Sequence, residues 1–244
     1  PMTPPSTGGP RGAGARRRSL LRPLLAGAVV LVLAFAFANL ASEVLEGDTH
    51  AFDLWLLHQA QAIRAAHPWV TEVMRDLSGL GSTVSLALVT VATVGYLALA
   101  LSHRSALVVA VSVVSGSQLM VLLKNTIGRL RPDAQFAALL APGLSFPSGH
   151  ASMAAIVFLT LGSLIASTRA SLRERSYILG VAALFTLLVG LSRVALGVHW
   201  ATDVLGGWAF GAGWAMVWLM WVRGLGRRDH HQVADRRDTG RESA

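Results

Sequence analysis

The sequence predicts an all-α integral membrane protein, a bundle of six transmembrane helices with an amphipathic interfacial helix between spans 1 and 2. Three observations predict this class. Of the 244 residues, 53% are hydrophobic. Only 14% are charged, whereas ordinary soluble domains have about 25%. The apolar residues also fall in runs that are long enough to cross a bilayer.

Composition excludes several other classes. The formal net charge is +8, but the basic residues lie in the tails and short loops, without the interleaved aromatics of single-strand binders. We therefore expect no nucleic-acid partner. Because the chain has no cysteine, disulfides and thiol nucleophiles are excluded.

The expected spans are six apolar runs: Leu24–Ala41, Val84–Leu101, Ala106–Leu123, Ala151–Ser167, Tyr177–Leu191 and Val204–Val222. For the first run a cleaved signal peptide is the alternative, but no small-x-small cleavage site leads into a soluble domain. The runs define one domain over residues 24–222. The basic tails, 1–23 and 223–244, are expected to be disordered.

Residues 42–80 form the longest segment that we expect not to span the membrane. Within it Phe52, Trp55, Leu56 and Ile63 recur at helical spacing, which predicts an amphipathic helix in the membrane interface. A solvated connector is the alternative. In the last span Gly206, Gly207, Gly211 and Gly213 favour tight helix contact, either inside the bundle or in a homodimer, with internal packing preferred.

Positive charge predicts the orientation of the spans. With a cytoplasmic N-terminus, the arginines of the 102–104 and 168–176 connections and of the C-terminal tail all fall on the cytoplasmic side. Both termini are then cytoplasmic. Lys124, Arg129, Arg131 and Arg193 fall on the opposite, extracytoplasmic side, where they break the rule and require another explanation.

These exceptions belong to three polar blocks that the six-span topology brings to one membrane surface. In the first block Lys124 and Arg131 are seven positions apart, which places them on one helical face, and Pro132 marks the end of the helix. Two like charges near hydrocarbon are costly. A phosphate between them would satisfy both.

The other two blocks supply a helix N-terminus and a histidine–carboxylate pair. Ser148 is expected to cap a helix, and Gly149 allows close backbone approach, so free N–H groups and His150 face the same surface. In the third block Arg193 precedes His199 and Asp203. The last two are one helical turn apart, and such a carboxylate makes an imidazole more nucleophilic.

A metal site made from His150, His199 and Asp203 is the alternative reading of these blocks. The surrounding cations, Lys124, Arg131 and Arg193, would repel a metal ion. We therefore expect no metal and no other cofactor.

The three blocks resemble the motifs of the type 2 phosphatidic acid phosphatase superfamily, which shares its phosphate site with vanadium haloperoxidases. They match Lys-x6-Arg-Pro at Lys124–Pro132, Pro-Ser-Gly-His at 147–150 and Ser-Arg-x5-His-x3-Asp at Ser192–Asp203, in that order. The resemblance in span layout covers roughly residues 24–222, and the membrane spans exclude a soluble haloperoxidase.

The resemblance implies a metal-independent membrane lipid phosphatase. His199 would form a phosphohistidine, Asp203 would fix its tautomer, and His150 would act as general acid and then as base. The nonbridging oxygens would be held by five residues: Lys124, Arg131, Ser148, Gly149 and Arg193.

The substrate implied is a lipid phosphate, namely polyprenyl pyrophosphate or monophosphate, phosphatidylglycerophosphate or phosphatidic acid, and an outward-facing site fits recycling of a polyprenyl carrier. A phosphotransferase to a lipid or sugar hydroxyl is one alternative. A lipid-phosphate binding or transport protein without catalysis is the other. Sequence leaves open whether residues 42–80 gate substrate entry.

Overall fold

The structure, a computed structural model, describes residues 11–101 and 103–242, with side chains placed for residues 21, 23–100 and 103–221. The described part of the chain is built from helices: α1 (Arg11–Glu46), α2 (His50–Ala66), α3 (Trp69–Leu80), α4 (Thr83–Tyr96), the short π-helix η1 (Leu97–Leu101), α5 (His103–Ile127), the 3-10 turn η2 (Ala134–Phe136), α6 (Gly149–Ser167), α7 (Leu172–Ala195) and α8 (Ala201–Glu242).

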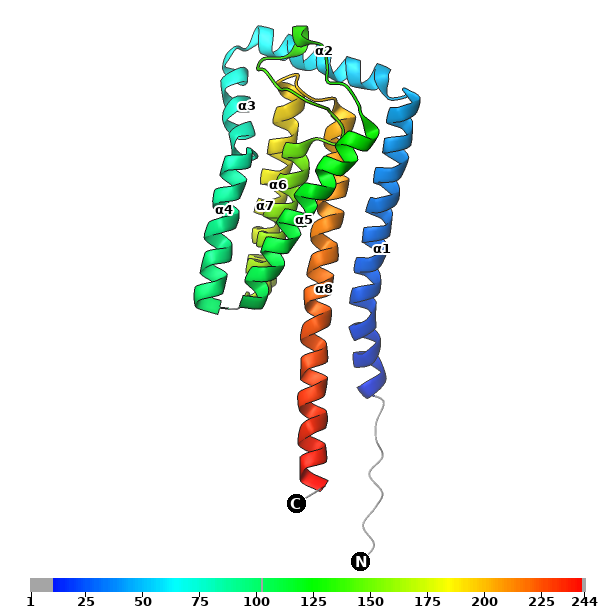
Figure 1. Cartoon of the computed structure of the whole chain (residues 1–244), viewed down its shortest axis with the longest axis vertical. Helices are drawn as coiled ribbons and strands as arrows, with labels where there is room; N and C mark the ends of the chain where they lie inside the picture. Colours follow the sequence, from blue (N-terminus) through cyan, green and yellow to red (C-terminus); the bar gives the residue numbers. More distant parts are fainter. Residues whose placement is uncertain (1–10, 102, 243–244) are drawn as a thin grey trace, which may run out of the picture.

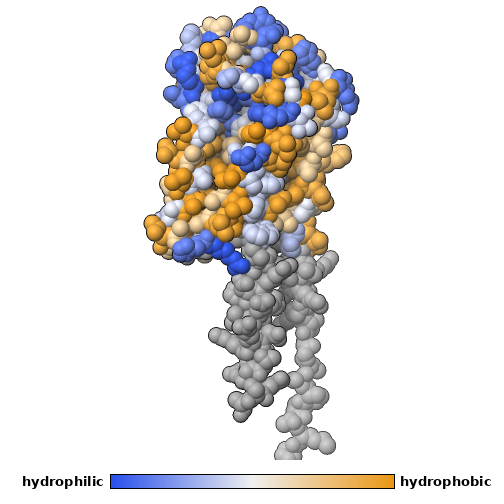
Figure 2. Space-filling view, viewed as in Figure 1, coloured by the Kyte–Doolittle hydropathy of each residue, from blue (hydrophilic) through white to orange (hydrophobic). Residues whose placement is uncertain are grey.

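Six stretches of the described chain are long and apolar enough to span a membrane, which confirms the predicted class. They are Pro23–Glu46, Trp69–Ala100, His103–Ile127, Gly149–Ser167, Leu172–Ala195 and Ala201–Trp221. Figure 1 shows the long helices side by side, with α2 across one end of the bundle. In Figure 2 an apolar band lies between that polar end and a second, smaller polar surface.

Helix α6 lies at the centre of the bundle, because small residues let α7 and α8 approach it closely. A Cβ atom added at Gly211 of α8 would lie 2.4 Å from the carbonyl oxygen of Ser152 on α6, and one at Gly207 would lie 2.9 Å from the Ser148 carbonyl. The glycines of the last span therefore serve internal packing, as preferred from the sequence. The homodimer remains a prediction.

Helix α2 presents two different faces. Asp53 and Leu57 face the bundle and are almost completely buried. The predicted apolar stripe points elsewhere: Phe52, Trp55 and Ile63 are each about half exposed. An apolar stripe turned away from the protein, on a helix across the end of the spans (Figure 1), fits the predicted interfacial helix.

Three expectations about boundaries differ from the structure. Residues 69–80 belong to the second candidate span, where α3 leads into α4. That stretch has 32 residues, more than the roughly 20 that cross a bilayer, which leaves room at the membrane surface for the charges of α3, where Arg75 pairs with Glu72 at 3.1 Å. Residues 11–23 and 223–242, expected to be disordered, are helical continuations of α1 and α8. Arginine, alanine and leucine favour helix, and extending an existing helix needs no new nucleus. Residues 1–10 and 243–244 lie outside the described residues.

Candidate active site

The residues predicted to form the site converge at the end of the bundle that α2 covers. A cavity of about 340 Å³ lies there, between the start of α6, the end of α7 and the loop that follows α5. Six of the eight predicted site residues line it: Lys124, Arg131, Gly149, His150, Arg193 and His199. The other two, Ser148 and Asp203, are completely buried behind it.

The His199–Asp203 contact forms as predicted, but through a turn rather than along one helix. Helix α8 begins at Ala201, so His199 precedes it and Asp203 lies in its first turn. The Nδ1 atom of His199 lies 3.1 Å from Oδ2 of Asp203. The backbone N–H of Trp200 donates to the same Oδ2 at 3.0 Å, which fixes the turn.

The partners of His199 select one tautomer. Nε2 of His199 lies 3.0 Å from Nη1 of Arg131. Because a guanidinium has only donors and a carboxylate only acceptors, the neutral imidazole carries its proton on Nδ1 and its lone pair on Nε2. That lone pair is directed toward the Arg131 side of the cavity.

His199 is neutral at physiological pH. Burial lowers the pKa of its imidazole to about 4, and the charges of Arg131 and Lys124 act in the same direction, whereas Asp203 opposes them. A neutral imidazole in this tautomer is the form that a nitrogen nucleophile requires.

Three cations surround the cavity, and protein oxygens anchor each of them. Lys124 Nζ donates to the carbonyl oxygens of Leu144, at 2.8 Å, and Ser145, at 3.1 Å. Arg131 donates to the Val198 carbonyl at 2.7 Å.

Arg193, which is 5% exposed, donates from Nη1 to the hydroxyl of Ser78 at 2.5 Å. Its Nε has no hydrogen-bond partner although it is buried. A buried donor without a partner, with two further cations nearby, is the arrangement expected of an anion-binding site.

The geometry of the first block differs from the sequence expectation. Helix α5 ends at Ile127, and Gly128 follows with φ +68°, the left-handed conformation that ends helices. Arg131 therefore lies in the loop, and it does not share a helical face with Lys124. Both side chains still reach the same cavity, because the loop folds back over the end of α5.

The second block has the predicted helix start. Ser148 is the N-cap of α6, and its hydroxyl accepts from the N–H of Ala151 at 3.5 Å. The N–H of Ser148 donates to the backbone carbonyl of Asp203 at 2.9 Å, which joins the second block to the third. Gly149 and His150, in the first turn of α6, line the cavity.

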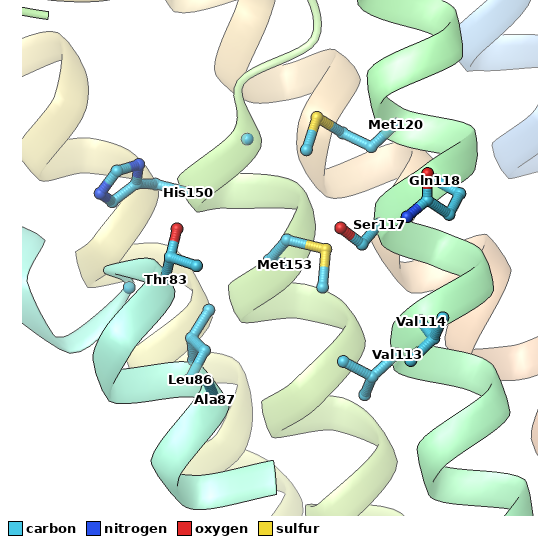
Figure 3. Close-up of a pocket in the computed structure, with 12 residues that line it drawn as sticks. Thr83, Leu86, Ala87, Val113, Val114, Ser117, Gln118, Met120, His150 and Met153 are labelled. Carbon is cyan, nitrogen blue, oxygen red and sulfur yellow. The ribbon is translucent and has the colours of Figure 1, made fainter.

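A second cavity, of about 350 Å³, leads from His150 down between α4, α5 and α6. Most of its lining is apolar, including Leu86, Val113, Val114 and Met153. Figure 3 shows His150 at one end of this groove, with Met153 and Ser117 directed into it. Gly149 and His150 line both cavities, so the polar site and the apolar groove meet at the first turn of α6.

Sequence reasoning missed two residues that contact His199 and Asp203. Arg129 Nη1 lies 2.7 Å from Oδ1 of Asp203. The Ser145 hydroxyl donates to Oδ2 of Asp203 and lies 3.4 Å from Nδ1 of His199. Arg129 was already an exception to the positive-charge rule, because it falls on the predicted extracytoplasmic side. Ser145 carries no comparable signal.

A membrane-embedded helical bundle with a histidine–aspartate pair inside a cluster of cations defines a membrane protein that handles phosphate groups. Comparison with known proteins agrees. The model of the PAP2 superfamily matches residues 105–227.

Two relatives are phosphatases by name. The chain is 34% identical to phosphatidylglycerophosphatase B of Bacillus subtilis over 155 residues, which cover 62% of this chain and 74% of that protein. It is 34% identical to lipid A 1-phosphatase of Rhizobium johnstonii over 115 residues, 43% of each chain.

Solved structures give the same result. The crystal structure of the transmembrane PAP2 type phosphatidylglycerolphosphate phosphatase from Bacillus subtilis has a TM-score of 0.74 and 28% identity, covering 80% of this chain and 96% of that one. Aquifex aeolicus LpxE, with a TM-score of 0.51 and 22% identity over 68% of this chain and 93% of its own, shares the fold. The chain belongs to the PAP2 superfamily, and it is a hydrolase, a membrane lipid phosphatase of the PAP2 type.

Proposed function

We propose that the protein hydrolyses a lipid phosphomonoester or pyrophosphate through a phosphohistidine on His199, without a metal, at the extracytoplasmic membrane surface. The observation that carries this proposal is the position of His199 between Asp203 and Arg131. Its Nε2 lone pair points into a cluster of cations, and its Nδ1–H is held by Asp203.

In the first step Nε2 of His199 attacks phosphorus, the new P–N bond forms and the P–O bond to the lipid breaks. His150, at the mouth of the cavity, gives its proton to the departing oxygen. In the second step His150 takes a proton from water, the water oxygen attacks phosphorus, and the P–N bond breaks. Free phosphate leaves, and both histidines return to their starting forms.

The cations around the cavity stabilise the charge on the transferring phosphoryl group. Lys124, Arg131 and the unpaired Nε of Arg193 would hold its nonbridging oxygens, together with the N–H groups at the start of α6. Ser148, behind the cavity, would contribute by capping that helix start. Phosphoryl transfer depends mainly on positioning and charge neutralisation. The groups present can therefore act without a metal.

The apolar groove of Figure 3 supports a substrate with a hydrocarbon tail. Because Gly149 and His150 line both cavities, a phosphate near His199 would leave its tail in the groove between α4, α5 and α6. The similarity to phosphatidylglycerophosphatase B makes phosphatidylglycerophosphate the first candidate. Phosphatidic acid and polyprenyl pyrophosphate also combine a phosphate group with a hydrocarbon tail, and they are the next candidates.

Charge supports the extracytoplasmic placement. Helix α6 begins at the site and runs for 19 residues, which is about 28 Å, to Arg169 in the connection and Arg173 and Arg175 at the start of α7. Basic connections stay in the cytoplasm. Because the chain has no cysteine, single cysteines at Leu140 beside the site and at Arg169 can be compared directly. A membrane-impermeant maleimide should label only Leu140→Cys in intact cells, and labelling of only Arg169→Cys would reverse the orientation.

The activity itself is tested by phosphate release from purified protein, with and without chelator, over the three lipid phosphates and a soluble phosphate ester. We expect turnover of a lipid that chelator leaves unchanged and that His199→Ala abolishes. Unchanged turnover in folded His199→Ala would refute the nucleophile. Consumption of lipid without free phosphate, in the presence of a lipid or sugar hydroxyl, would instead establish a phosphotransferase.

A further inference from the structure

Asp203 has more partners than the one that a histidine-orienting carboxylate needs. Its Oδ2 accepts from Ser145, Trp200 and His199. Its Oδ1 accepts from Arg129 at 2.7 Å. The two oxygens therefore have separate tasks, and Arg129 holds the one that faces away from His199.

Arg129 joins Asp203 to a second buried carboxylate, that of Asp53. Its Nη2 lies 2.6 Å from Oδ2 of Asp53, while its Nη1 donates to both Asp203 and the hydroxyl of Thr202. The guanidinium also lies 5.3 Å from the centre of the Trp200 ring. With a side chain only 13% exposed, Arg129 is a fixed bridge rather than a mobile surface charge.

Asp53 comes from α2, far from the three motif blocks in the sequence. It is completely buried. Its Oδ1 accepts from the N–H of Thr202 at 3.0 Å, and its Oδ2 accepts from the Thr202 hydroxyl at 2.6 Å. Asp53 thus binds the free N-terminus of α8, one residue before Asp203, and stabilises that turn together with the helix dipole.

Hydrogen bonds of Ser145 connect Arg129 and Asp203 a second time. The N–H of Ser145 donates to the carbonyl of Arg129 at 2.8 Å, and the Ser145 hydroxyl donates to Asp203. The loop after α5, the approach to α6 and the start of α8 are therefore tied at one point. A displacement of Arg129 would change the direction of the carboxylate that orients His199.

We propose that Asp53 and Arg129 are positioning residues for the phosphatase reaction and that, through them, helix α2 holds the Asp203–His199 pair in its reactive geometry. The inference rests on the proposed role of His199 as nucleophile. Neither side chain lines the cavity, so neither is expected to contact substrate. Their effect should fall on the chemical step and spare binding.

The test compares Asp53→Asn, Arg129→Gln, Arg129→Lys and the double variant Asp53→Asn/Arg129→Gln with wild type. Asp48→Asn, an exposed carboxylate in the turn before α2, is the matched control. Lipid phosphate turnover gives kcat and KM, and competitive inhibition by inorganic phosphate reports the anion site without a bond to His199. A thermal midpoint in detergent shows whether each variant is folded.

We expect Arg129→Gln to lower kcat by about 10- to 100-fold, the usual effect of losing a partner that orients a reactive ligand. KM and inhibition by inorganic phosphate should stay close to wild type. Arg129→Lys should recover part of the loss, because it keeps the charge but not the two-sided bridge. The kcat of the double variant should be no lower than that of Arg129→Gln, since both changes break the same chain of contacts from Asp53 through Arg129 to Asp203. The double variant removes both charges of the pair, so it can be assayed even if a single variant leaves an unpaired buried charge and does not fold.

The proposal is wrong if folded Asp53→Asn and Arg129→Gln keep wild-type kcat, or if the losses appear in KM and in inhibition by inorganic phosphate. It is also wrong if the two substitutions multiply in the double variant. These outcomes differ from failure of the proposed nucleophile, which would show as normal turnover in His199→Ala.

Discussion

Replacing Asp203 by asparagine should stop turnover by changing the tautomer of His199 while preserving the fold and the anion site. Oδ1 of Asp203 faces the Arg129 donor at 2.7 Å, and Oδ2 faces the His199 ring at 3.1 Å. An asparagine has one oxygen and one NH₂ group to offer these positions. The charge of Arg129 holds the oxygen against the competing N–H of Trp200, so the NH₂ group faces Nδ1 of His199.

The imidazole must then accept at Nδ1 and carry its proton on Nε2, the atom that has to attack phosphorus. In the serine protease triad the equivalent change lowers kcat by about ten-thousandfold, or ~5 kcal/mol. Asp203 is completely buried, so water cannot restore the original tautomer. We expect a loss of the same order.

Single-turnover phosphate release measures this loss directly. Competitive inhibition by inorganic phosphate should remain, because Lys124, Arg131 and Arg193 are unchanged and phosphate binds them without a bond to His199. Asp76→Asn, an exposed carboxylate on α3, should behave as wild type. A folded Asp203→Asn enzyme with kcat within about tenfold of wild type would refute the tautomer argument.

Three further predictions follow from particular contacts. Because burial lowers the pKa of His199 to about 4, its neutral form persists in mild acid. The acid limb of kcat/KM, corrected for substrate ionisation measured by phosphorus NMR, should therefore lie near pH 4, and an acid limb near the ordinary value of about 6.5 would contradict this. The unfolded chain binds the proton between these two values, so the free energy of unfolding should also decrease over that range as pH falls. Gly211→Ala places a Cβ 2.4 Å from a backbone oxygen and should cost roughly 1–3 kcal/mol and lower the thermal midpoint, whereas Gly213→Ala, with its nearest neighbour at 3.7 Å, should not. Met153→Trp should narrow the groove and raise KM for a lipid phosphate but not for a soluble ester; an equal effect on both substrates would argue against a tail in the groove.

The sequence was sufficient for the parts of the structure that depend on local pattern. Apolar runs predicted the six spans, and the charged exceptions Lys124, Arg131 and Arg193 predicted that three distant segments meet. The helix start at Ser148 was also local, because an N-cap depends on residues within one turn. Membrane topology then reduced the possible arrangements enough to place these segments on one surface.

The remainder depended on contacts that no local pattern encodes. Asp53 is one acidic residue among several in its segment, and its partner Arg129 is 76 positions away. The end of α5 was placed too late, because Gly128 rather than Pro132 ends the helix. The charges on α3 concealed its place in the second span, because the apolar run Val84–Leu101 was by itself about long enough to cross a bilayer.

The central claim is that His199 carries the phosphoryl group during turnover. It is tested most directly by rapid acid-free quenching of the enzyme during turnover, followed by mass spectrometry of the peptide that contains His199. The His150→Ala variant with an aryl phosphate, whose leaving group needs no proton, should accumulate the intermediate because water activation is slowed. We predict a phosphoryl group on His199 that is lost in acid and is missing from His199→Ala. Continued phosphate release from an enzyme with no label on His199, or with the label on another residue, would contradict the mechanism.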